Sequence, residues 1–237
     1  MRAGHRERCP APGYPRGSLL PIERIAPGIH RFTARHPEWH PGQFGAEVAG
    51  YAVREPGRTL LIDPLVLDDA GWQALDRVVE GDVEILITIP YHVRSAAAAA
   101  RRYRGRIWGH PACRSRLGRT RLHELSPKRA PDDVRAFAIG KPVRQEMPLL
   151  IESRRALCFG DSVVGLGGRE GPVRVWVWNG ASQDWYRDRY LPTLKPLAEV
   201  GADTLLLTHG PAVARDGSDE LRGALRRRSW DRDRHTR

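Results

Sequence analysis

Apolar and polar positions alternate along most of the chain, and their spacing changes from strand-like to helix-like several times. Residues 22–34 and 47–54 alternate around Pro-Gly turns, which predicts antiparallel strands. Residues 59–62 form a more apolar run that ends at Asp63, as expected of a buried strand. In residues 69–80 the apolar spacing becomes that of a helix with one buried face.

The succession of strands and helices then continues and repeats. Residues 84–88 predict a buried strand, and 95–103 predict a helix because Ser95 can cap it and five alanines follow. Residues 114–133 show no periodicity and predict a polar connection. Further strands are predicted near 106–112, 134–140, 147–153, 156–162, 173–178 and 203–210, and helices near 183–201 and 217–228. Two blocks of strands with interleaved helices favour two face-to-face β-sheets with helices outside, an α+β fold.

Length and composition set bounds on this picture. The 237 residues are 41% hydrophobic, which is enough for one substantial core. We expect a disordered N-terminal segment at 1–20, a single domain at 21–226 and a disordered basic tail at 227–237. The three cysteines are few and scattered, which fits a reducing cytoplasm. No apolar run approaches the roughly 20 residues that span a bilayer, so no membrane is expected.

The net charge of +11 raises the question of a nucleic-acid partner. Residues 1–16 have a net charge of +3 and residues 222–237 one of +5, which leaves +3 for the rest of the chain. Most of the excess therefore lies in the two ends. The arginines also outnumber the lysines by 36 to 3, which the codon use of a GC-rich genome explains as readily as phosphate binding does. Nucleic-acid binding is thus only weakly supported.

Four segments resemble motifs of one family in the right order. "TLLIDPLV" contains Asp63 at the end of a strand, "ILITIPYHVRS" precedes a helix, "ALCFGDSVVG" contains Asp161, and "TLLLTHG" ends near His209. Together they resemble the metallo-β-lactamase fold, an αββα four-layer sandwich, over residues 22–226. The resemblance implies a family of metal-dependent hydrolases, in which histidines and aspartates bind zinc and lower the pKa of the water that attacks the substrate.

The loop after residue 88 departs from that family at the positions of its H-x-H-x-D-H motif. The motif positions are occupied by Ile89, Tyr91, Val93 and Arg94. The middle histidine of the family should lie within "AIGKPVRQEM", which has none. The residual candidate metal ligands are Asp161, His209 and, after a shift of one residue, His92. The resemblance therefore indicates a degenerate metal site and no cofactor. The alternative that stays open is one weakly bound zinc ion at these three residues.

Each of these polar residues can also have a purely structural role. His209 can order a Gly-Pro turn, Asp161 can cap the turn that follows it, Asp63 can end a strand, and His92 can be a solvated loop residue. A buried carboxylate without a metal needs another cation. We therefore predict that Arg94 pairs with Asp161 and that Arg94→Ala destabilises the fold.

Three classes of function remain open at this stage. The chain can be a hydrolase relative with little or no metal-dependent activity. It can be an active hydrolase with a single metal at Asp161 and His209. It can also be a binding protein that holds a small molecule in the former cleft or a nucleic acid. The sequence does not identify catalytic residues, a substrate or an oligomeric state.

Overall fold

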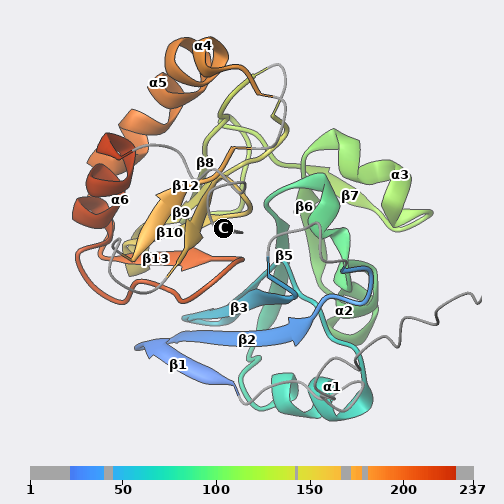
Figure 1. Cartoon of the computed structure of the whole chain (residues 1–237). Helices are drawn as coiled ribbons and strands as arrows, with labels where there is room; N and C mark the ends of the chain where they lie inside the picture. The colour runs from blue at the N-terminus through green and yellow to red at the C-terminus, as the bar shows by residue number, and fades with distance from the viewer. Residues whose placement is uncertain (1–21, 40–44, 142–143, 167–171, 178–180, 228–237) are drawn as a thin grey trace, which may run out of the picture.

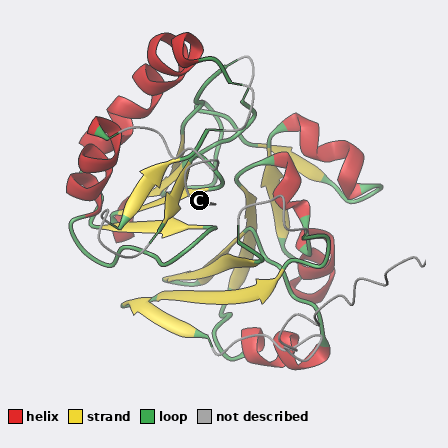
Figure 2. Ribbon diagram, viewed as in Figure 1, coloured by secondary structure: helices red, strands yellow, loops and turns green. Residues whose placement is uncertain are grey.

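Two β-sheets face each other, and helices cover the outer side of each sheet (Figures 1 and 2). The computed structural model describes residues 22–39, 45–141, 144–166, 172–177 and 181–227. The segments predicted to be disordered, 1–20 and all of 227–237 except Arg227, lie outside the described residues. Among the described residues no helix has the length and apolar character needed to cross a membrane.

The larger sheet has seven strands in chain order. They are β1 (Glu23–Ala26), β2 (Ile29–Arg35), β3 (Glu47–Glu55), β4 (Arg58–Ile62), β5 (Asp82–Ile87), β6 (Arg106–Gly109) and β7 (Leu122–Glu124). Strands β1 to β4 pair antiparallel: two-residue turns join β1 to β2 and β3 to β4, and a longer segment, 36–46, joins β2 to β3. Strands β4 to β7 pair parallel because helical connections carry the chain back each time. Those connections contain α1 (Asp69–Asp76), α2 (Ala96–Tyr103) and α3 (Arg114–Leu117).

The smaller sheet has the order β13-β10-β9-β8, and a separate pair, β11 and β12, lies near it. These strands are β8 (Val134–Ala136), β9 (Leu149–Ile151), β10 (Ala156–Phe159), β11 (Val163–Gly165), β12 (Val173–Val175) and β13 (Thr204–Leu207). The helices over this sheet are α4 (Gln183–Trp185), α5 (Leu191–Leu194) and α6 (Gly217–Arg226). A π-helical segment, Tyr186–Tyr190, joins α4 to α5, and a 3₁₀ segment, Lys195–Glu199, follows α5.

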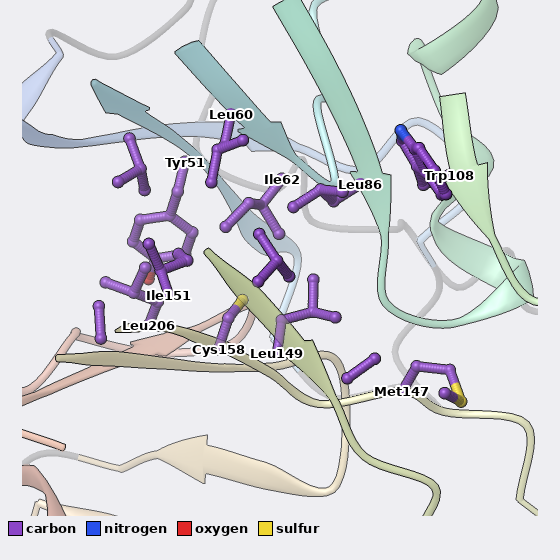
Figure 3. Close-up of a cluster of buried hydrophobic side chains, with 14 of the residues drawn as sticks. Tyr51, Leu60, Ile62, Leu86, Trp108, Met147, Leu149, Ile151, Cys158 and Leu206 are labelled. Atoms are coloured by element: carbon purple, nitrogen blue, oxygen red, sulfur yellow. The ribbon is translucent and has the colours of Figure 1, made fainter. Parts of the chain in front are cut away.

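The main core lies between the two sheets. Figure 3 shows side chains of the larger sheet, such as Tyr51 and Ile62, facing Leu149 and Cys158 of the smaller one. The hydroxyl of Tyr51 donates to the carbonyl of Leu207 at 2.7 Å and accepts from the Leu207 N–H at 2.9 Å. This pair of hydrogen bonds satisfies the only polar atom of the tyrosine side chain and links β3 to β13 across the core.

Two further cores lie between each sheet and its helices. The four layers of helix, sheet, sheet and helix are those predicted. The structure corrects the prediction for 114–133, where α3 and β7 replace a purely polar connection, because Leu117 and Leu122 are buried against the edge of the larger sheet. The helix predicted at 69–80 ends earlier, at Asp76.

Candidate functional site

The candidate site lies where four strands end. Asp63 follows β4, Thr88 and His92 follow β5, Asp161 follows β10, and His209 follows β13. Strands β4 and β5 are parallel, and so are β10 and β13, so the carboxyl ends of each pair lie at one edge of their sheet. Because the two sheets face each other, these two edges meet, and Asp161 of one sheet lies close to His92 of the other.

Asp63 holds the loop after β5. Its carboxylate accepts the N–H of Thr88 at 2.8 Å and the Thr88 hydroxyl, and it lies 2.9 Å from Nδ1 of His92. Asp63 and His92 are both buried. The backbone at Asp63 has a φ of +47°, a left-handed conformation that aspartate tolerates better than most residues. Asp63 is therefore a positioning residue for His92, as well as the residue that ends the strand.

Asp161 connects the two histidines. Its Oδ1 lies 3.3 Å from Nε2 of His92 and 3.4 Å from Nε2 of His209. Burial opposes the charge on this carboxylate, but the two histidines outweigh that effect and hold its pKa well below the usual value. The pKa of His92 is raised because, against its burial and the nearby Arg94, the carboxylates of Asp63 and Asp161 favour its charged form.

Two glycines permit these close approaches. At Gly160 a Cβ would lie 2.7 Å from Oγ1 of Thr88, so only glycine lets the end of β10 approach the end of β5. At Gly210, with a φ of +77°, a Cβ would lie 1.8 Å from the carbonyl oxygen of Gly165. The carbonyl of His209 accepts the Gly165 N–H at 2.8 Å, which fixes the turn that carries the histidine.

Arg94 does not pair with Asp161, and that prediction is wrong. Within the described part of the chain its hydrogen bonds go to main-chain acceptors: Nη1 donates to the carbonyls of Ala49 at 3.2 Å and of Asp63 at 3.1 Å. These acceptors belong to β3 and to the end of β4, so the guanidinium is held on the larger sheet instead of on the turn after β10. Burial lowers the pKa of Arg94, and the nearby carboxylates of Asp63 and Asp161 oppose that shift.

Replacement of Arg94 by alanine is expected to lower the free energy of unfolding by about 2–3 kcal/mol, because two buried carbonyls lose a charged donor. Urea denaturation measures the change. Arg101→Ala, which removes an exposed arginine from α2, is the matched control and should leave the midpoint near that of the unaltered protein. Equal losses in the two variants would contradict a specific role of Arg94.

The other positions of the loop do not contribute to the polar cluster. Ile89 and Val93 are buried apolar residues, and Tyr91 is 66% exposed. Since the loop forms a 3₁₀ turn over Pro90–Val93, His92 is the polar residue that this turn directs inward. The structure thus brings His92, Asp161 and His209 together and leaves Ile89, Tyr91 and Val93 outside the polar cluster.

Sequence reasoning missed Glu146. This carboxylate is fully buried and accepts the N–H groups of Gly160 at 3.0 Å and Ser162 at 3.2 Å, the Ser162 hydroxyl, and Nη2 of Arg144 at 2.6 Å. It therefore holds both residues that flank Asp161. Glu146 and Arg144 belong to "AIGKPVRQEM", the segment in which a histidine was sought, and two oppositely charged residues spaced two apart were the available signal.

His36 was also missed. It follows β2, and its pKa is lowered by burial and by the positive charges of Arg94, His92 and His209. It lies just beyond the end of β2 in the larger sheet. Its Nδ1 accepts the N–H of Glu38 at 3.3 Å.

The geometry of the polar cluster bears on whether it could hold a metal ion. Among the described residues no group of three or more histidine, cysteine, aspartate or glutamate side chains has the geometry to hold a metal ion. The chemistry that the cluster offers is that of hydrogen-bonded acids and bases: two carboxylates on either side of an imidazole, and a second imidazole, His209, whose side chain is 15% exposed.

Comparison with known proteins identifies the fold. No protein-family model matches the sequence, and a search of curated proteins gives no significant match. Among solved structures, the mono-zinc form of the metallo-β-lactamase FIM-1 from Pseudomonas aeruginosa is 13% identical, with a TM-score of 0.61 over 89% of this chain and 96% of that one. A metallo-β-lactamase from Pontibacter korlensis is 14% identical, with a TM-score of 0.61 over 88% and 97%.

A third similar structure is a metallo-β-lactamase family protein from Thermus thermophilus, which is 16% identical with a TM-score of 0.58 over 85% of this chain and 78% of that one. The chain therefore has the metallo-β-lactamase fold, and the predicted αββα sandwich is confirmed. At these identities the likeness concerns the fold alone.

Proposed function

We propose that this chain is a metallo-β-lactamase-fold protein without metal-dependent hydrolase activity, in which buried ion pairs take the place of a metal centre. The observation that supports the proposal is the set of charged side chains that lie together where the strands end. Three carboxylates, Asp63, Asp161 and Glu146, share the site with the guanidinium groups of Arg94 and Arg144.

The two guanidinium groups argue against a dinuclear zinc centre. An arginine stays charged in a protein, so its positive charge cannot be removed to admit a metal ion. The side chain of Arg144 is 8% exposed and its charge is matched by Glu146. Because Glu146 already balances Arg144, this carboxylate is not available to balance a divalent ion, and the guanidinium of Arg94 would repel such an ion.

The residues at the site also provide too few metal ligands for a dinuclear centre. Zinc in proteins takes three or four nitrogen, oxygen or sulfur ligands. The loop after β5 contributes only His92, and the segment before β9 contributes Glu146, whose oxygens already accept from backbone, hydroxyl and guanidinium donors. No step of a metal-dependent hydrolysis is therefore assigned to these residues.

A second candidate is a hydrolase with one metal ion at His92, Asp161 and His209. The observation that favours it is the approach of two Nε2 atoms to the same Asp161 oxygen at 3.3 and 3.4 Å, which is longer than a charge-assisted hydrogen bond. Asp63 on Nδ1 of His92 also resembles the second carboxylate that orients metal-bound histidines. Within the described residues, however, this group lacks metal-site geometry.

Metal content separates the two candidates. The protein is purified without chelator, incubated with zinc, manganese or iron, desalted and analysed by elemental mass spectrometry. We expect no retained metal and no zinc-dependent rise in Tm, because only a ligand that binds the folded state stabilises it. One metal ion per chain that is lost in His209→Ala and kept in the control His123→Ala would establish the second candidate and overturn the first.

A further inference from the structure

We propose that the exposed surface over α3 and the edge strand β7 binds single-stranded nucleic acid. We call this surface the basic patch and define it by Tyr91, Arg114, Arg116, Arg119, Arg121, Lys128 and Arg129. The proposal does not depend on whether the candidate site at the strand ends holds a metal ion.

The charge of the described chain is concentrated on the basic patch. Residues 114–129 contain five arginines, one lysine and one glutamate, a net charge of +5. The residues that the structure does not describe account for +5 of the chain's +11, so the described residues carry +6 in all. Outside this one segment, acidic and basic residues of the described chain nearly balance. Concentrated charge of this kind attracts a polyanion.

The six basic side chains of the patch are exposed. Across the described ranges, none of them forms an ion pair with a carboxylate, whereas many other arginines do, among them Arg31, Arg58, Arg102, Arg155 and Arg222. The structure therefore neutralises many of its other arginines internally and leaves these for solvent or for a partner.

The patch continues from the loop after β5 to the edge of the larger sheet. The guanidinium of Arg116 lies over the ring of Tyr91, 5.5 Å from its centroid, which joins α3 to the loop that carries His92. At the other end, burial lowers the pKa of His123 of β7, and Arg121 and Arg129 lie close enough to lower it further. Figure 1 shows α3 and β7 on the side of the molecule away from α4, α5 and α6.

The chemistry of the patch favours nucleic acid over an acidic protein. Arginine binds phosphate oxygens in a bidentate manner and stacks on bases, and arginine predominates here. Tyr91, 66% exposed, offers a ring on which a base can stack, which is how proteins that bind single strands gain affinity. A protein partner would require an apolar centre, but Leu67 and Tyr91 are the large hydrophobic side chains exposed among the described residues.

Fluorescence anisotropy with labelled oligo(U)20 and oligo(dT)20 tests the proposal on the full chain. Arg114, Arg116, Arg119 and Arg121 are replaced together by alanine. Each phosphate contact with a single strand contributes about 0.7 to the slope of log affinity against log salt, so we expect the slope to fall by about 3. The matched control replaces Arg228, Arg232, Arg234 and Arg237, which removes the same charge from the tail.

Tyr91→Ala provides an independent variant. It should weaken binding roughly 5- to 100-fold through lost base stacking and leave the salt slope unchanged. Circular dichroism verifies that each variant is folded. The proposal is overturned if the unaltered protein does not bind at 50 mM salt, or if only the tail variant loses binding. Equal competition by polyglutamate, with no effect of Tyr91→Ala, would assign the patch to an acidic protein instead.

Discussion

Replacement of Arg144 by methionine is expected to lower the free energy of unfolding by about 3–5 kcal/mol, the usual cost of leaving one partner of a buried ion pair without the other. Glu146, whose side chain is fully buried, would retain its hydrogen bonds from the backbone of Gly160 and Ser162 but lose its cation. The guanidinium also lies over the rings of Trp176 and Tyr190, at 5.6 and 5.8 Å from their centroids, so packing is lost as well.

Urea denaturation measures this change. Arg155→Met is the matched control, because the ion pair between Arg155 and Asp203 is exposed and contributes little. The double variant Arg144→Met with Glu146→Gln should recover part of the loss, since it leaves no unpaired buried charge. If Arg144→Met unfolds at the same urea concentration as Arg155→Met, the ion pair does not hold the site together.

Replacement of Asp63 by alanine is expected to cost roughly 3–7 kcal/mol of unfolding free energy. The buried donors of Thr88 and His92 would each lose an acceptor, at about 1–3 kcal/mol apiece. Alanine at the positive φ of this position adds about 1 kcal/mol of backbone strain. The loss also leaves His92 without the carboxylate that orients it.

Two control variants separate these contributions. Asp216 has a similar φ of +56° and no capping hydrogen bond from its side chain, so Asp216→Ala reports mainly the strain, about 1 kcal/mol, plus the weak effect of a carboxylate at the start of α6. Asp63→Asn keeps an acceptor for the Thr88 N–H and removes the charge, and we expect an intermediate loss. The argument fails if Asp63→Ala is no less stable than Asp216→Ala.

The strands and most helices could be predicted from the sequence because their apolar spacing is a local property. Strands β2, β3 and β4 lie where alternation placed them, and helix α2 lies where its alanines placed it. The predicted cap at Ser95 is wrong, because its hydroxyl bonds to the main chain of Val66 instead of to the first turn of α2. Residues 114–133 were the exception because α3 and β7 are short and stand among many charged and polar residues, whereas the equally short β8, β9 and β12 lie in apolar or alternating runs. Strand β7 is held in the sheet by its pairing with β6. Because β6 is distant in sequence, the spacing of apolar residues within 114–133 does not reveal this pairing.

The candidate site was only partly predictable. Asp63, Asp161 and His209 follow apolar strands, so their positions followed from the strand pattern and the family resemblance, and His92 followed from its loop. The partners of these residues did not follow. Arg94 donates to carbonyls of β3 and of the chain after β4, and Glu146 accepts from the turn after β10.

By itself, the sequence determined most of the strand and helix content and the order of the four strand-end segments. Through the family resemblance it also gave the hypothesis that the metal motif lacks ligands. Only the tertiary structure decided that Arg144 and Glu146 form a buried pair beside Asp161, that Arg94 faces main-chain carbonyls, and that the arginines of 114–129 lack acidic partners among the described residues. The physical reason is that the partner of a charged side chain is set by segments packed beside it, which are distant in sequence, whereas apolar periodicity is set by neighbours along the chain.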